Sequence, residues 1–256
     1  MNKSNLSNQS LPGPETITEA PLSNGIKVMV RANSNSPSVV LGGHMPCGAL
    51  FDPPEKLGLA NFTALGLMRG TARRSFQQIY EALESNAASL GFGGGMHTIG
   101  FNGRSLAEDL PLLLDLLRES LCEPVFPPEE IERLRAQLLT GLALRTQDTS
   151  EMAALTFSQL LYREHPYAQP EDGWPETVAA ITRDDLANFH KHHFGPAGLV
   201  LVIVGAVEPG KTIDLAEKVL GDWKNPGQPP PPSLPDFQPI PKSTRRKVTV
   251  PGKAQS

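Results

Sequence analysis

Residues 58–71 read Gly-Leu-Ala-Asn-Phe-Thr-Ala-Leu-Gly-Leu-Met-Arg-Gly-Thr. The run is mostly apolar and small, and Gly70 follows a basic residue, as is common where a helix ends. The stretch therefore predicts a buried helix. Asn61 and Leu65 stand four residues apart, which places both on one helix face, and Ala64 directly precedes Leu65. None of these three side chains can ionise.

A second informative segment, residues 132–141, reads Glu-Arg-Leu-Arg-Ala-Gln-Leu-Leu-Thr-Gly. It lies within a stretch of helical pattern that Pro127-Pro128-Glu129-Glu130 opens and that continues for several residues beyond the segment. Gly141 inside a helix costs about 0.8–1 kcal/mol relative to alanine. Nothing else in the sequence explains a glycine at this position.

The two segments resemble the signature of the insulinase/pitrilysin family of metallopeptidases. In that family the first segment typically reads Gly-Leu-Ala-His-x-x-Glu-His-x-x-x-x-Gly-Thr. It holds the inverted H-x-x-E-H motif, with two histidine zinc ligands and a glutamate base, and the second segment supplies a glutamate as third ligand. By this resemblance Asn61 and Leu65 replace the histidines, Ala64 replaces the base and Gly141 replaces the third ligand. Glu164-His165-Pro166-Tyr167 also occurs in family order.

The substitutions remove the chemistry of the motif. A catalytic zinc needs three protein ligands and an open position for water. Leu65 has no lone pair to donate, Ala64 cannot accept a proton, and Asn61 offers only a neutral amide oxygen, which is a poor zinc ligand. We therefore expect no catalytic residue, no bound metal and no cofactor in this chain. Leu65 is expected in the core, and Asn61 is expected to form local hydrogen bonds.

The remaining pattern predicts an α+β fold in which a mixed, largely antiparallel sheet packs against helices. Asn24-Gly25 predicts the turn of a hairpin, and residues 38–45 and 199–205 predict further strands. Because the early strands join by short turns, the pattern favours a sandwich of sheet and helices over a doubly wound sheet. Further helices are expected at residues 75–89, 107–121, 150–163, 182–193 and 209–223.

The sequence predicts four segments along the chain. Residues 1–14 are polar and expected to be disordered, and residues 15–225 are expected to form the peptidase-like domain. Residues 226–243 are rich in proline and predict a linker. Residues 244–256 contain Val248-Thr249-Val250, which predicts a strand, and then Pro-Gly-Lys-Ala-Gln-Ser. This ending is similar to the opening of the family's second domain, so we expect the start of a truncated second, similar domain.

Composition excludes several classes of function. The net charge of −4 gives no electrostatic basis for binding nucleic acid or an anionic membrane. No charged start precedes an apolar run, so the sequence predicts neither a signal peptide nor a membrane span. Cys47 and Cys122 form no C-x-x-C motif and are expected to be free thiols in a reducing compartment. A cytoplasmic protein is expected.

The resemblance implies a function in a pair of subunits. Family members that work as pairs include bacterial heterodimers and mitochondrial processing peptidase, in which one subunit carries zinc and the other closes the substrate chamber. This chain is then a non-catalytic domain, inactive on its own, whose partners are an active zinc-peptidase subunit, its own second domain and a peptide. The zinc belongs to the active partner. An alternative is a structural protein on the same scaffold, like the core subunits of the respiratory cytochrome bc complex, without peptide handling.

The resemblance also implies an edge strand that holds an extended peptide, here Gly91, Phe92, Gly93, Gly94 and Gly95. Backbone pairing of this kind needs few side chains, but glycine-rich strands are weak and poor in register. A flexible strand or bulge without substrate contact is the alternative. A phosphate loop is disfavoured because the run lacks a Lys-Ser/Thr ending and leads into a strand.

Other reactive side chains give weaker signals. His190, His192 and His193 lie close together, and His190 and His193 share a helix face, but no Asp, Glu or Cys adjoins them to complete a metal site. We expect a solvated helix end there. His44 and His97 are expected on strands near the motif helix. No G-x-S-x-G elbow supports a serine hydrolase.

Overall fold

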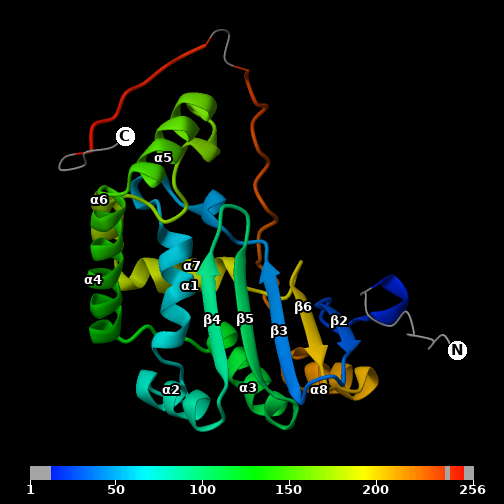
Figure 1. Cartoon of the computed structure of the whole chain (residues 1–256). Coiled ribbons are helices and arrows are strands. Elements are labelled where there is room, and N and C mark those ends of the chain that lie inside the picture. Colours follow the sequence, from blue (N-terminus) through cyan, green and yellow to red (C-terminus); the bar gives the residue numbers. More distant parts are fainter. Residues whose placement is uncertain (1–12, 240–242, 251–256) are drawn as a thin grey trace, which may run out of the picture.

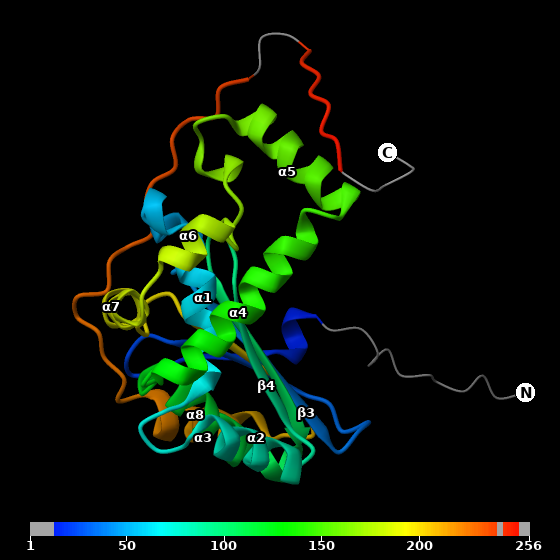
Figure 2. The same cartoon turned by 90° about the vertical axis from the view of Figure 1, so that its left-hand side faces the viewer.

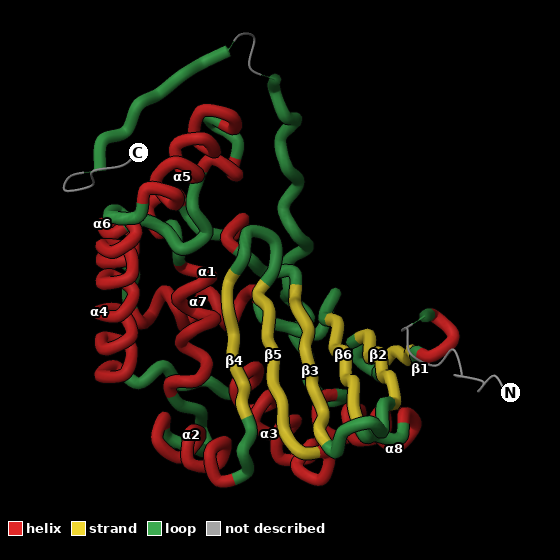
Figure 3. The backbone as a smooth tube through the Cα atoms, viewed as in Figure 1, coloured by secondary structure: helices red, strands yellow, loops and turns green. Residues whose placement is uncertain are grey.

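A computed structural model describes residues 13–239 and 243–250, and these form one six-stranded sheet with eight α-helices (Figure 1). The strand order is β1-β2-β6-β3-β5-β4, which Figure 3 shows from β4 at one edge to β1 at the other. β2 and β6 pair in parallel, and every other neighbouring pair is antiparallel. The predicted α+β fold with a mixed, largely antiparallel sheet is confirmed. The strands are β1 (Thr18–Pro21), β2 (Lys27–Ala32), β3 (Ser38–Met45), β4 (Ser89–Gly94), β5 (Ile99–Leu106) and β6 (Val200–Gly205).

The helices gather on one side of the sheet, as Figures 1 and 2 show, and α5 stands beyond the strand ends. Five of the eight were expected from helical periodicity, and α4 and α1 from the two signature segments. The short α6 was not predicted. The helices are α1 (Leu59–Gly66), α2 (Phe76–Ser85), α3 (Leu110–Cys122), α4 (Pro128–Arg145), α5 (Thr149–Tyr162), α6 (Pro175–Ala180), α7 (Arg183–His193) and α8 (Pro209–Leu220).

The core lies between the sheet and these helices. Alternate strand residues such as Val39, Leu41 and Met45 of β3 are buried on this side, as expected for a sheet with one covered face. Phe62 and Ala64 of α1 are fully buried in the same cluster. The helix that carries the motif positions is therefore an integral part of the core.

The opposite face of the sheet is not covered by any α-helix of the described residues (Figure 2). Val40 on this face is 53% exposed, and the registers place Arg104 and Val204 beside it. At Gly91 and Gly93 an added Cβ would meet no atom within 4 Å. In the described part of the chain, this face of the sheet carries both apolar and charged side chains and is exposed.

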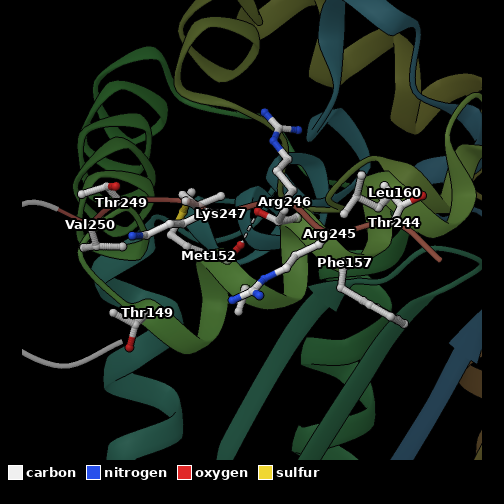
Figure 4. Close-up of a pocket in the computed structure, with 13 residues that line it drawn as sticks. Thr149, Met152, Phe157, Leu160, Thr244, Arg245, Arg246, Lys247, Thr249 and Val250 are labelled. Atoms are coloured by element: carbon white, nitrogen blue, oxygen red, sulfur yellow. Dashed lines mark hydrogen bonds between the residues drawn. The ribbon is translucent and has the colours of Figure 1, made fainter.

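The segment after α8 has no helix or strand. Its start is tied to the domain, because the Asn225 side chain donates to the carbonyl of Phe194 at 2.7 Å and that of Gln228 donates to the carbonyl of Ala197 at 3.0 Å. Residues 244–250 lie along α5 and enclose a pocket of about 530 Å³ with it (Figure 4). Val248-Thr249-Val250 form no strand with the described residues, and the expected second domain stays a prediction. Residues 1–12, 240–242 and 251–256, on which parts of the segment predictions fall, lie outside the described residues.

Two other expectations concern the whole chain. Cys47 is buried, Cys122 is partly buried, and both are free, which confirms the prediction of free thiols. In the described ranges no helix has the length and apolar character needed to cross a membrane. The cytoplasmic compartment stays a prediction.

Candidate functional site

A buried carboxylate anchors the start of α1. Asp52 accepts hydrogen bonds from the backbone N–H groups of Gly58 at 2.8 Å and Ala60 at 2.9 Å, which have no partner within the helix. Burial raises the pKa of Asp52 to about 7, against the opposite effect of these amide bonds. Gly58 has a φ of 95°, and a Cβ there would lie 2.8 Å from the carbonyl oxygen of Asp172. Only glycine suits this junction.

The four positions that the resemblance assigns to zinc chemistry have different surroundings. Asn61 is half-buried and lines a pocket, whereas Ala64 is fully buried and Leu65 packs against the core. Gly141 is exposed on α4, with open space where a side chain would project. Because these residues supply neither imidazole nor carboxylate, they do not fit a zinc ion.

Asn61 forms a hydrogen bond that joins α1 to the edge of the sheet. Its Oδ1 accepts from the backbone N–H of Gly94, the last residue of β4, at 3.1 Å. The two backbones are in direct contact, because a Cβ on Gly94 would lie 2.5 Å from the Cα of Asn61. Asn61 was expected to form local hydrogen bonds, and this expectation is wrong, because its partner Gly94 is 33 positions away in the sequence.

β4 is one of the two edge strands of the sheet, and it contains Gly91, Phe92, Gly93 and Gly94; Gly95 lies in the following turn. The Gly95 N–H donates to Thr98 across the hairpin at 2.8 Å. In antiparallel pairs, alternate residues turn both backbone groups toward the neighbouring strand. The intervening Leu90, Phe92 and Gly94 therefore direct theirs away from β5. Within the described residues, the outward N–H groups of Leu90 and Phe92 have no hydrogen-bond partner.

A pocket of about 450 Å³ opens at the end of this edge. Asn61 and Gly94 form one wall, α5 contributes another, and the loop around the 3-10 helix Pro166–Ala168 closes it. Glu151 and Glu171 line the pocket, and neither forms an ion pair with a described residue. The pocket therefore combines a strand edge, a carboxamide and two acidic side chains that have no ion pair within residues 13–239 and 243–250.

Arg145 at the end of α4 holds the loop that forms the pocket floor. Its guanidinium bonds to the carboxylate of Asp172 and donates to the carbonyl of Gly173 at 3.0 Å. It also lies 5.3 Å from the centre of the Trp174 ring, where a cation–π contact is favourable. No sequence pattern indicates a role for Arg145, because each of these contacts joins parts of the chain that are distant in sequence.

A second contact joins the β4–β5 hairpin to the loop that lines the pocket. His97 Nε2 lies 2.6 Å from Tyr167 Oη, and the two rings meet edge to face at 5.5 Å. His97 lies in the turn between β4 and β5, so its expected place on a strand is wrong. His44 is on β3 as expected, on the uncovered face of the sheet. Tyr167 belongs to the family-like Glu-His-Pro-Tyr run, whose side chains therefore position this loop.

The expected solvated histidine end of α7 is wrong for two of its three residues. His190 donates from Nε2 to the carbonyl of Leu121 at 2.9 Å, and burial lowers its pKa. His193 packs its ring 4.5 Å from those of Phe51 and Phe189. Only His192 is exposed. Across residues 13–239 and 243–250, no group of three or more His, Cys, Asp or Glu side chains is placed to hold a metal ion.

The relatives of the chain include proteins described as zinc proteases, such as one of Streptomyces coelicolor that is 22% identical over 244 residues, covering 95% of this chain and 52% of that one, and proteins described as subunits. The chain is 25% identical over 213 residues to a probable mitochondrial-processing peptidase subunit beta of Arabidopsis thaliana, covering 83% of this chain and 40% of that one. It is 26% identical over 211 residues to human cytochrome b-c1 complex subunit 1, covering 81% and 43%. A crystal structure titled as a peptidase M16 inactive domain from Pseudomonas fluorescens superimposes with a TM-score of 0.75 at 25% identity, covering 88% and 54%.

The chain thus spans about half the length, or less, of the proteins it matches. Two family profiles also match. The profile described as peptidase M16 inactive domain matches residues 180–256. The profile described as insulinase (peptidase family M16) matches residues 27–170, which is more than half of the chain. The chain belongs to the insulinase family of peptidases, family M16.

Proposed function

We propose that this chain is a non-catalytic domain of a zinc-metallopeptidase-like subunit, which pairs with an active H-x-x-E-H subunit to form a peptide-binding chamber. The observation that carries the proposal is the residue that α1 turns toward the pocket. The helix keeps its family position beside the edge strand, but its pocket-facing residue is Asn61, whose oxygen is occupied by Gly94. The helix thus lies beside a strand edge that a peptide could pair with, but it carries no zinc ligands and no glutamate base to activate water.

Peptide binding is supported by the geometry next to this helix. Leu90 and Phe92 turn backbone groups to the open side of β4, which is the requirement for adding a strand to a sheet. The edge ends at a pocket of about 450 Å³. An extended peptide paired with β4 would therefore pass Asn61 and place its next residues in that pocket.

One observation supports a partner subunit, and another supports a second domain of the same subunit. The names of two relatives describe them as subunits, one of a processing peptidase and one of the cytochrome b-c1 complex. One face of the sheet is also free of α-helices in the described part of the chain, and Val40 on it is 53% exposed. This face suits a second domain of the same subunit, and zinc would be supplied by the active partner.

Reconstitution tests the proposal. The chain is mixed with an H-x-x-E-H subunit, and hydrolysis of a quenched fluorescent peptide library is compared with that by each protein alone. We expect no hydrolysis by the chain alone and an increase of kcat/KM in the mixture. A photoreactive peptide should crosslink to residues 89–97. Failure of every such mixture to form a complex or change hydrolysis would contradict the proposal.

The second candidate function is a structural subunit without peptide handling. The match to human cytochrome b-c1 complex subunit 1 favours it. The two functions differ in the β4 edge, since a structural subunit has no need of an accessible one. Complex formation without crosslinking of any peptide to residues 89–97 would support the structural role.

A further inference from the structure

We infer that Asn61 is a peptide-binding residue, whose carboxamide takes up the last outward N–H group of β4 and presents its own N–H₂ group to a main-chain carbonyl of the bound peptide. The inference rests on the proposed function, because it concerns how a peptide is held on the same edge. It assigns a positive role to a side chain that stands in place of a zinc ligand.

The orientation of the carboxamide follows from its partner. The backbone N–H of Gly94 can only donate, so the Asn61 atom that faces it at 3.1 Å must be the oxygen. The nitrogen therefore points the other way. In the described part of the chain, Asn61 Nδ2 has no hydrogen-bond partner, and the residue lines the pocket at the end of β4. Two N–H donors are available to a ligand there.

The position of these donors continues the pattern of the strand edge. Outward-facing residues recur every second position along β4, at Leu90, Phe92 and Gly94, a spacing of about 6.6–6.8 Å. A peptide paired with Leu90 and Phe92 would next meet the N–H of Gly94, which is already bonded. Asn61 Nδ2 replaces that donor, displaced toward the pocket by the length of the carboxamide. Asn61 Nδ2 would thus be the last hydrogen-bond donor that a peptide meets along the edge of β4.

The donor is also held in place before a peptide binds. A Cβ on Gly94 would lie 2.5 Å from the Cα of Asn61, so α1 and β4 are in backbone contact at this point. The preceding residue, Ala60, donates its N–H to the buried carboxylate of Asp52. A donor fixed from both sides loses little conformational freedom on binding, which favours affinity.

Two substitutions separate this role from a purely structural one. Asn61→Asp keeps an oxygen for the Gly94 N–H but replaces the free donor by a charged acceptor, which repels a peptide carbonyl. Asn61→Ala removes both groups and releases the Gly94 N–H to bind the carbonyl itself. Asn188→Asp, on the exposed side of α7, is the matched control for the added charge. Circular dichroism checks that each variant is folded.

The probe is a fluorescein-labelled nonapeptide of alternating threonine and valine, which favours the extended conformation. Its affinity is measured by fluorescence anisotropy, and its contacts are mapped by amide chemical shifts of the ¹⁵N-labelled chain. We expect shifts at Leu90, Phe92 and the Asn61 side-chain amide. Asn61→Asp should bind about 10-fold more weakly, and Asn61→Ala and Asn188→Asp within about 3-fold of the wild type.

The outcomes distinguish the role of Asn61 from peptide binding by the β4 edge as a whole. Shifts at Leu90 and Phe92 with equal affinity for wild type and Asn61→Asp would overturn the role of Asn61 and leave peptide binding on β4 standing. Weaker binding by Asn61→Ala than by Asn61→Asp would show that the oxygen bond to Gly94 alone matters, and would also overturn it. Absence of any shift along β4 in the wild type would overturn both the inference and peptide binding by this edge.

Discussion

The carboxylate of Asp52 accepts a hydrogen bond from the backbone N–H of Ala60 at 2.9 Å, one residue before Asn61. Together with the bond from Gly58 at 2.8 Å, it fixes the start of the helix that borders the pocket. The same carboxylate is buried deeply enough for its pKa to rise to about 7. The placement of the candidate site is therefore linked to a group that titrates near neutral pH.

This link predicts a pH dependence of stability. The folded chain holds the Asp52 proton more tightly than the unfolded chain, because the pKa rises from 3.8 to about 7. The stabilisation by the protonated form is complete below pH 4 and is lost as the pH rises toward 7. We expect the free energy of unfolding of the wild type to fall relative to Asp52→Asn by on the order of 2–4 kcal/mol across this window.

Urea unfolding of both proteins at several pH values measures this difference. The comparison with Asp52→Asn cancels the groups that titrate in the opposite direction, such as Asp185, whose pKa is lowered by the Lys56 and Thr182 hydrogen bonds despite partial burial. A difference that is constant from pH 4 to pH 8 would show that Asp52 is ionised throughout.

The backbone contact between α1 and β4 predicts different responses of two neighbouring glycines. An alanine Cβ at Gly94 would lie 2.5 Å from the Cα of Asn61, whereas at Gly93 it would meet nothing within 4 Å. We expect Gly94→Ala to lower the free energy of unfolding by about 2 kcal/mol or more, and Gly93→Ala to change it by less than about 1 kcal/mol. Equal effects in thermal unfolding would mean that α1 does not contact the strand end.

A buried ion pair supports the loop after α1. Glu119 of α3 is fully buried, contacts the guanidinium groups of Arg73 and Arg74, and accepts from the hydroxyl of Thr71 at 2.9 Å. Glu119→Gln removes the buried charge of this cluster, although Arg73 and Arg74 keep their ion pairs with Asp115, so we expect a loss of about 1–3 kcal/mol in the free energy of unfolding. Exposed Glu176→Gln is the control. A loss below about 0.5 kcal/mol for both would show that the pair is solvated.

The elements that the sequence predicted well are those whose pattern is local. The strand expected at residues 38–45 is β3, Ser38–Met45, because its apolar run of Val39, Val40 and Leu41 favours extended structure. The apolar run at residues 199–205 supplies β6, Val200–Gly205. Gly70, expected to end the motif helix, ends the 3-10 turn that continues α1, with a φ of 149° that favours glycine.

The pocket was not predictable, because its walls meet through contacts between distant residues. Asn61 and Gly94 are 33 positions apart in the sequence. Arg145 and Asp172 are 27 positions apart, with α5 between them in the sequence. The six-residue α6, Pro175–Ala180, is too short to show an apolar period. Asp52 carried one signal, since an acidic residue just before Pro53-Pro54 and the motif helix is suited to bind free helix N–H groups.

The proposed replacement of the zinc ligands predicts what their restoration should do. Asn61→His, Leu65→His and Gly141→Glu together return the three ligand types, and space exists for the new side chain at Gly141. We expect this triple variant to take up zinc in equilibrium dialysis. Adding Ala64→Glu should lower the free energy of unfolding by about 3 kcal/mol or more, because Ala64 is fully buried. A folded triple variant without zinc would contradict the assignment of at least one segment.

The most direct test of the central claim is the zinc content of the purified wild-type chain after loading with zinc and removal of free metal. The central claim is that the chain has the fold of an M16 peptidase domain but binds no zinc at the positions that the family uses. Because Asn61, Ala64, Leu65 and Gly141 provide no zinc ligand set, mass spectrometry should find well below one zinc per chain, with no change in Asn61→Ala. One tightly bound zinc per chain, lost in Asn61→Ala, would contradict the account.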